Sequence, residues 1–324
     1  MNPMPSSDQT VSTLRGRSMG TAWSVKLVVP RTRHLQELQA RIQAALDRVV
    51  AQMSSWDANS DISRYNRAPA GHWSRLPEEL HTVLRAALAV ARASAGAFDP
   101  TVGAMVDLWG FGATGRRRQV PTATQIAQAR QRCGWQRLQL QDGQLQQPGG
   151  LVLDLSAIAK GFGVDCVRHA LRQADVTCAL IDVGGELFGY GRKPDGSGWR
   201  VLVESTPDEE DGAALPTRVL TLNGAAIATS GDRWHHFDVD GQRYAHTIDP
   251  RTGAPLLDAP AAVTVLAEDA MHADAWATAM TVLGAEAGLA YARDADLAVR
   301  FLLRRSGTLH EVMSPAFEHR LATA

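Results

Sequence analysis

The sequence predicts an α+β fold with mixed or antiparallel sheets and flanking helices. Apolar residues recur at helical spacing through most of the first half, and short β-branched segments fill most of the second half. Strands and helices do not alternate regularly along the chain, as they would in a doubly wound parallel sheet. This order of elements therefore favours α+β over a regular βαβ winding.

The chain begins with one predicted strand and one long helix. Residues 22–29 read as a strand, because apolar residues alternate into a β-branched run that ends at Pro30. Residues 35–53 carry an apolar face at helical spacing. Residues 54–75 are rich in Asp, Asn, Ser and Arg, and we expect them to form a loop.

Two further helices and a hairpin follow before residue 150. Pro77 opens a second helix, and Gly96 stands just past its end. Residues 122–133 predict a third helix. Residues 138–147 predict a hairpin that turns at Asp142-Gly143.

A buried strand and a helix are predicted at the centre of the chain. The strand is 151–155, and it leads directly into Ser156, a good N-cap for a helix that ends near Gln173. Two helices, 270–283 and 286–293, are predicted near the end of the chain. The remaining predicted elements are an acidic loop at 207–216 and strands at 179–183, 199–204, 218–222, 243–248, 262–266 and 299–303.

The organisation predicted from these elements is one large domain at 18–315, which could divide into two subdomains near residue 150. Residues 1–17 and 316–324 are expected to be tails. The first 21 residues contain neither the apolar segment of a signal peptide nor a cysteine for lipid attachment. We therefore expect a cytoplasmic protein, unless a leader has been removed.

Composition excludes several classes of protein. The 33 basic and 34 acidic residues give a net charge of −1, so no strong overall field favours nucleic acid or anionic lipid. No apolar run approaches the ~20 residues of a membrane-spanning helix. With 45% hydrophobic residues, the chain is expected to be a soluble globular protein. The three cysteines lack a C-x-x-C pair and are expected to be small buried apolar side chains: Cys133, Cys166 and Cys178.

Two patterns match binding motifs but lack the context that those motifs need. Residues 110–115 have the glycine spacing of a dinucleotide-binding loop, but three arginines and a proline follow, so no helix can begin there. His235 and His236 are adjacent, so on a strand they would point to opposite faces. Neither pattern is therefore assigned a ligand.

A carboxylate and a hydroxyl on one helix are more informative. Asp274 and Thr278 lie four residues apart in the predicted helix 270–283, so their oxygens share one face. Such a hard oxygen pair suits Mg²⁺ when substrate phosphates complete its coordination. Taken alone, the pair also fits a solvated helix face.

Seven segments, taken together, favour the metal site over the solvated helix face. In order they are 53–66, 97–112, 153–161, 182–186, 228–232, 246–253 and 273–278. With Met19-Gly20-Thr21 before them, they resemble the FAD:protein FMN transferase (ApbE) family, from Met19 to about Gly284 or some four-fifths of the chain. This resemblance implies an ApbE-like flavin transferase fold.

The resemblance also implies an activity and a set of site residues. Members of this family move FMN from FAD to a Thr or Ser hydroxyl of a target flavoprotein, with Mg²⁺, and release AMP. By resemblance, Mg²⁺ is held by Asp274, Thr278 and the main-chain carbonyl of Ala157. The residues implied to contact the flavin nucleotide are Met19, Trp56, Ala97, Phe98, Asp99, Lys160 and Ile248.

Three residues are candidates for catalysis: Lys160, Asp274 and His246. Lys160 is one of only three lysines beside thirty arginines, which makes a chance lysine less frequent at this place. Ser156 is expected to cap its helix and to bring a positive dipole end toward the phosphates. His246 is our candidate for the base or proton shuttle that activates the acceptor hydroxyl.

The sequence leaves two alternatives open. Water could replace the acceptor hydroxyl, which would make the protein an FAD pyrophosphatase that releases FMN and AMP. The protein could also bind FAD without catalysis, although the intact Asp274, Thr278 and Lys160 argue against this. Asp249 and Arg251 are expected to fix the turn beside His246 rather than to react. Relatives often have Gly-Gly in place of Ser156-Ala157, a difference that removes no reactive group.

Overall fold

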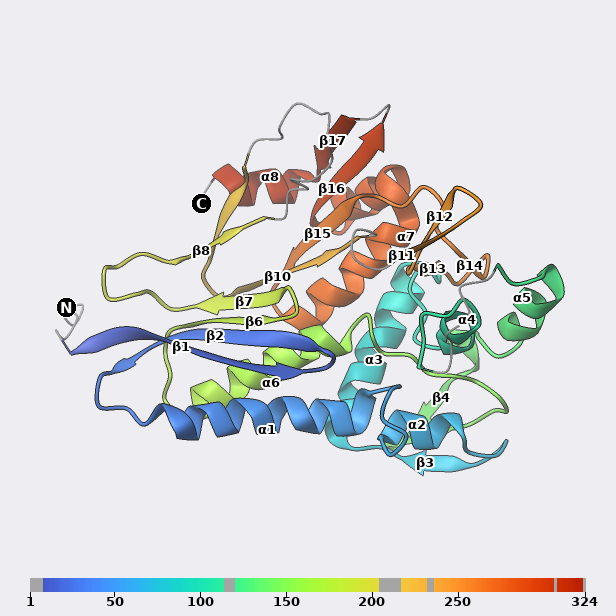
Figure 1. Cartoon of the computed structure of the whole chain (residues 1–324), viewed down its shortest axis with the longest axis horizontal. Coiled ribbons are helices and arrows are strands. Elements are labelled where there is room, and N and C mark those ends of the chain that lie inside the picture. The colour runs from blue at the N-terminus through green and yellow to red at the C-terminus, as the bar shows by residue number, and fades with distance from the viewer. Residues whose placement is uncertain (1–7, 114–119, 204–216, 232–235, 306–307, 323–324) are drawn as a thin grey trace.

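The computed structural model describes residues 8–113, 120–203, 217–231, 236–305 and 308–322 (Figure 1). The three arginines after residue 115, the acidic loop at 207–216 and His235 lie outside these residues. Within the described part of the chain, no helix is both long enough and apolar enough to span a membrane.

An eight-stranded sheet forms the centre of the molecule. Its strand order is β1-β2-β6-β7-β10-β15-β16-β17, and every neighbouring pair is antiparallel. Strands from both sides of residue 150 therefore share one sheet. The strands are β1 (Gln9–Ser18), β2 (Thr21–Pro30), β6 (Ala179–Val183), β7 (Glu186–Tyr190), β10 (Ala225–Ser230), β15 (Ala262–Ala267), β16 (Ala298–Arg305) and β17 (Thr308–Met313).

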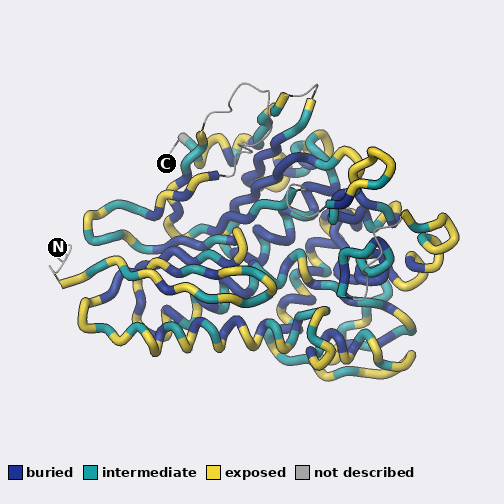
Figure 2. The backbone as a smooth tube through the Cα atoms, in the orientation of Figure 1, coloured by how far each residue is buried: buried dark blue, intermediate teal, exposed yellow. Residues whose placement is uncertain are grey.

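Helices cover one face of this sheet. They are α1 (Leu35–Met53), α6 (Ala159–Gln173) and α7 (Ala270–Asp294), and they pack side by side below and behind the strands in Figure 1. Alternate residues of β2, β6 and β7 enter the shared core with apolar residues of the helices. The opposite face is covered by β8 (Trp199–Leu202), β9 (Val219–Leu222) and α8 (Pro315–Ala322), whose Phe317 is fully buried. Figure 2 shows the buried residues concentrated in these central layers.

A second, smaller core lies around α3 (Glu78–Ala93), which packs against α1 and α7. A three-stranded sheet in the order β3-β5-β4 and several short helices complete this part. Its other elements are α2 (Asp61–Asn66), β3 (Trp73–Arg75), α4 (Gly103–Leu108), α5 (Ala123–Arg130), a 3₁₀ turn (Trp135–Arg137), β4 (Gln139–Gln141) and β5 (Gln144–Gln146). Two short pairs stand nearby, β11 (His236–Val239) with β12 (Gln242–Ala245) and β13 (Ile248–Asp249) with β14 (Ala254–Pro255).

Elements with strong local signals are confirmed. Helix α1 has the predicted bounds, and the residues of its apolar face are all buried. The predicted hairpin is β4–β5, and Asp142 and Gly143 have φ of 49° and 71°, as a tight two-residue turn requires. Thr122 caps α5 through a reciprocal capping box. The two helices predicted at the end of the chain are parts of α7, which is interrupted at Gly284 (φ 75°).

Several predictions about local structure are wrong. The expected loop 54–75 contains α2 and β3, and Ser60 caps α2 by accepting a hydrogen bond from the Ser63 amide. Both expected tails contain ordered elements, β1 and α8. Residues 243–248 do not form one strand, because β12 ends at Ala245 and β13 begins at Ile248.

A further error concerns the segment 151–155, which is extended and buried but belongs to no sheet. It makes one isolated bridge, between Val152 and Val102. Two of its amides bond to residues outside any strand: the Leu153 amide donates to Oδ1 of Asn66, the last residue of α2, at 2.8 Å, and the Asp154 amide donates to the Pro100 carbonyl at 2.9 Å. The alternating apolar pattern therefore indicates burial here, without a partner strand.

Candidate active site

Three charged side chains meet where α6, β7 and α7 come together. The ammonium of Lys160, in the first turn of α6, forms an ion pair with Oε1 of Glu186, the first residue of β7. The same ammonium lies 4.0 Å from Oδ1 of Asp274 in α7. Asp274 Oδ2 accepts a hydrogen bond from the Gly161 amide at 2.9 Å. The structure thus brings together two of the predicted catalytic residues, Lys160 and Asp274.

Close packing of α6 on α7 makes this arrangement possible. A Cβ atom on Gly161 would lie 2.1 Å from the carbonyl oxygen of Ala270 and 2.8 Å from Cβ of Asp274. Any larger residue would therefore push the two helices apart. Helix α6 begins at Ala159 and not directly after Ser156, whose hydroxyl bonds to Asp154 and caps no helix. The predicted cap is wrong, although Lys160 does lie in the first turn.

Burial and mutual attraction set the protonation of this cluster. Burial raises the pKa of the Asp274 and Glu186 carboxyls, and the nearby Lys160 opposes that rise. Burial lowers the pKa of the Lys160 ammonium, but Asp274 and Glu186 outweigh it and raise the pKa to about 12. Lys160 is therefore protonated at neutral pH.

A cavity of about 570 Å³ opens beside the cluster. Three residues predicted to contact the flavin nucleotide line it: Met19, Trp56 and Lys160. Met19 lies at the tip of the β1–β2 hairpin with φ of 50°. The Trp56 side chain follows α1 and is 69% exposed, although it is one of the largest apolar groups in the chain. The structure thus presents a free aromatic face at the edge of a cavity that contains an ammonium group.

The predicted metal ligands are one carboxylate, one hydroxyl and one main-chain carbonyl. Asp274 and Thr278 lie one turn apart on α7, and Ala157 precedes α6 in the segment that leads to Lys160. Asp274 Oδ1 lies 4.0 Å from the Lys160 ammonium, beyond hydrogen-bond distance. These donors fit a hard cation such as Mg²⁺. Among the described residues, no three His, Cys, Asp or Glu side chains form a metal-binding cluster, and the predicted set contains only one such side chain.

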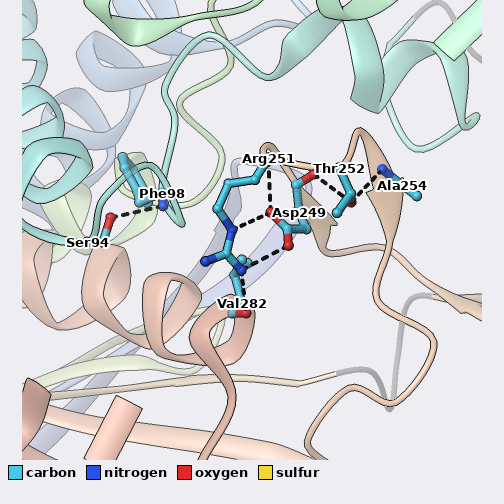
Figure 3. Close-up of polar contacts among 7 residues, drawn as sticks. All are labelled: Ser94, Phe98, Asp249, Arg251, Thr252, Ala254 and Val282. Atoms are coloured by element: carbon cyan, nitrogen blue, oxygen red, sulfur yellow. Dashed lines mark hydrogen bonds and ion pairs between the residues drawn. The ribbon is translucent and has the colours of Figure 1, made fainter. Parts of the chain in front are cut away.

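The other residues predicted to bind the nucleotide are buried and are not among those that line the cavity. Ala97, Phe98 and Ile248 are part of the protein interior. Asp99 accepts hydrogen bonds from the amide and the hydroxyl of Thr101, both at 2.7 Å. The Phe98 amide donates to Ser94 Oγ at 3.1 Å (Figure 3). The structure therefore gives Asp99 a role in shaping its loop, and its contact with a nucleotide stays a prediction.

The turn after Ile248 is fixed as the sequence predicts. The Asp249 carboxylate accepts from the Arg251 amide and from two guanidinium nitrogens, each at 2.9 Å (Figure 3). The same guanidinium donates to the carbonyl of Val282 in α7 at 3.3 Å. This turn is thereby fastened to the helix that carries Asp274.

His246, the predicted base, lies in a bend between β12 and β13 and not within a strand. It is half-buried, and its ring meets the edge of Phe111 with centroids 6.4 Å apart. The Asp249 turn lies three residues further along the chain. The ring is thus held by local packing, and its catalytic role stays a prediction.

Comparison with known proteins identifies the family. The ApbE family model matches residues 19–301. The chain belongs to the ApbE family. The "FAD:protein FMN transferase" of Klebsiella pneumoniae (strain 342) is 33% identical over 313 residues, which is 95% of this chain and 89% of that protein. The relatives are thus transferases by name.

Solved ApbE structures share the fold closely. The apo flavinyl transferase ApbE of Pseudomonas stutzeri superposes with a TM-score of 0.90 at 34% identity, covering 98% of each chain. The flavin transferase ApbE of Vibrio cholerae gives a TM-score of 0.88 at 32% identity, covering 96% of this chain and 100% of that one. The predicted α+β, ApbE-like fold is therefore confirmed.

Sequence reasoning assigned no role to two residues of this ApbE site, Glu186 and Gly161. Glu186 stands in a segment that matched the family, but nothing local indicates that it pairs with Lys160, 26 residues away. Its position directly after two glycines was the available signal, since a charged residue at the start of a buried strand requires a partner. Gly161 was visible as a glycine near the start of a helix, where alanine would be the better helix former.

Proposed function

We propose that the protein is a Mg²⁺-dependent FAD:protein FMN transferase, which moves FMN from FAD to a Ser or Thr hydroxyl of a flavoprotein and releases AMP. The observation that carries the proposal is the Lys160–Glu186–Asp274 cluster beside a cavity with an exposed Trp56. The names of the relatives support the same activity.

Three of the residues that line the cavity carry groups suited to FAD. The Trp56 ring offers a flat apolar face on which an aromatic ring of the substrate can stack. The Lys160 ammonium stays charged at neutral pH and would attract the diphosphate. Met19 supplies an apolar wall at the hairpin tip. Binding and orientation of the diphosphate are most of what phosphoryl transfer requires from a protein.

The metal would be held by Asp274, Thr278 and the carbonyl of Ala157. When bound there, Mg²⁺ would neutralise charge on the diphosphate and on the departing AMP. Lys160 shares that electrostatic task through its ammonium. The Asp249–Arg251 turn would keep the neighbouring His246 in place.

The transfer step is a nucleophilic substitution at phosphorus. The acceptor hydroxyl oxygen forms a bond to the phosphorus of the FMN half, and the bond from this phosphorus to the oxygen of AMP breaks. AMP leaves with the electron pair of that bond. The hydroxyl proton goes to His246, since an imidazole nitrogen can accept it.

The test is Asp274→Asn, assayed for release of AMP and FMN from FAD by chromatography. Asn keeps a carbonyl oxygen for the Gly161 amide but loses the charge, so the fold should survive. We expect AMP release to fall at least ~100-fold, as when a charge-stabilising group is removed from an active site. Full activity of this variant with added Mg²⁺ would refute the proposed site.

The same assay separates the alternative functions. AMP release that does not change when an acceptor protein is added would indicate an FAD pyrophosphatase. FAD that stays intact for days in the presence of the wild-type protein and Mg²⁺ would indicate a binding protein. Equal amounts of AMP and flavinylated acceptor support the transferase.

A further inference from the structure

Glu186 is the buried acid of the site to which no role has been given. Its side chain is 4% exposed, and Oε1 pairs with the Lys160 ammonium. Oε2 is buried and has no hydrogen-bond partner among the described residues. A buried carboxylate costs free energy unless it is paired, so this half-satisfied acid requires an explanation.

The β-hairpin places Glu186 opposite the helices. Gly184 and Gly185 form the turn between β6 and β7 with φ of 65° and 101°. Glu186 follows them and shares one face of β7 with Phe188 and Tyr190, whose rings lie in the core beneath the helices. Its carboxylate therefore points toward the start of α6, where Lys160 lies.

Two carboxylates compete for the one ammonium. Lys160 forms its ion pair with Glu186, while Asp274 Oδ1 stays 4.0 Å away, beyond hydrogen-bond distance. A lysine side chain has four rotatable bonds and would move to the remaining carboxylate if its partner were removed. In that case the ammonium would occupy the space beside Asp274 that a cation needs.

We propose that Glu186 is a positioning residue, which holds the Lys160 ammonium and so keeps Asp274 Oδ1 open to the divalent cation. This inference rests on the proposed function, because it assigns the cation to Asp274. A buried ion pair adds little to the stability of the fold compared with apolar packing. A role in metal binding would explain why the Lys160–Glu186 pair is present.

The test measures how the affinity for ADP depends on Mg²⁺ concentration. ADP carries a diphosphate but no flavin to transfer, so binding is read without turnover. Isothermal titration calorimetry compares the full-length wild type, Glu186→Gln, Lys160→Met and the double variant. Thermal melting of each protein checks that it is folded.

We expect Glu186→Gln to raise the Mg²⁺ concentration for half-maximal effect roughly ten- to hundredfold, the range for losing a group that orients a metal ligand. In the Lys160→Met background the same substitution should change that concentration by less than about twofold, because no ammonium is left to block Asp274. An equal rise in both backgrounds, or none in either, overturns the inference, since a structural role of Glu186 does not depend on Lys160.

Two controls separate this inference from the proposed function. Asp274→Asn should lose the Mg²⁺ dependence that the wild type has. If the wild type itself shows no Mg²⁺ dependence, the metal site of the proposed function is refuted along with the inference. If Glu186→Gln does not fold, Glu186→Asp replaces it, and its shorter side chain should raise the Mg²⁺ requirement in the same direction.

Discussion

Replacing Gly161 by Ala tests whether the close contact of α6 and α7 holds the site together. The added Cβ would lie 2.1 Å from the Ala270 carbonyl oxygen, a main-chain atom that cannot rotate away. It would also lie 2.8 Å from Cβ of Asp274, so the helices must separate just where the Gly161 amide donates to that carboxylate. We expect Gly161→Ala to lower the free energy of unfolding and to disturb the metal site.

The expected change in the free energy of unfolding is the sum of two opposing effects. Overpacking of a core contact costs about 3 kcal/mol, and the better helix propensity of Ala returns about 1 kcal/mol. The net loss is ~2 kcal/mol. In a chain of 324 residues, each kcal/mol lowers Tm by roughly 1.5 °C, so Tm should fall by roughly 3 °C. Because Asp274 is displaced, AMP release should fall at least tenfold, roughly the effect of losing a group that orients a metal ligand.

The control is Gly163→Ala in the same helix. Its added Cβ would meet Cε of Met19 at 2.8 Å, the flexible end of a side chain that can move aside. The gain in helix propensity is the same, so Tm should stay within about 2 °C of the wild type. Calorimetric melting is run on both variants and the AMP assay on Gly161→Ala, because Met19 lines the cavity and Gly163→Ala would move it. If Gly161→Ala has the same Tm as the wild type and releases AMP at the same rate, the proposed helix contact is wrong.

Two further predictions concern residues at the edge of the cavity and away from it. Trp56→Ala should raise the KM for FAD about fivefold through the loss of ring stacking, with kcat and Tm nearly unchanged because the side chain is exposed. An unchanged KM or a lowered Tm would contradict this role. Glu311→Gln should lower stability by about 3 kcal/mol at pH 7, since Arg218 and the buried Arg300 both bond to this carboxylate. Those arginines outweigh burial and lower the pKa of Glu311 below its ordinary 4.5, so its stabilising effect is present above that pH and is lost as the pH falls further. Melting curves at pH 7 and at about pH 3 should therefore show a smaller difference between variant and wild type at the lower pH, and an equal difference at both would refute the assignment.

Local patterns predicted the long elements of the fold. Helix α1 follows directly from the spacing of its apolar residues, because a helix of five turns repeats the signal several times. Short elements do not repeat their signal. Helix α2 has six residues, of which only Ile62 and Tyr65 are large buried apolar groups, so its sequence looked like a loop. Strand β1 was missed because it lies at the sheet edge and has mostly polar residues.

In the site as well, contacts within one helix could be predicted from the sequence, and contacts between distant elements could not. Asp274 and Thr278 could be paired from sequence because helical geometry places residues four apart on one face. The contact of Lys160 with Glu186 joins two elements, and no local pattern encodes it. The extended segment 151–155 was misassigned for a related reason, since its amides bond to residues distant in sequence, Asn66 of α2 and Pro100. Only the assembled fold shows these contacts.

The proposed reaction transfers FMN to a protein, and this transfer can be measured directly. The most direct measurement incubates the protein with FAD, Mg²⁺ and a candidate acceptor that carries a Ser or Thr site, and then determines the acceptor's intact mass. We expect a gain equal to one FMN, with AMP released in equal amount and with neither product formed by Asp274→Asn. Free FMN and AMP without any modified acceptor, across acceptors that known family transferases do modify, would contradict it.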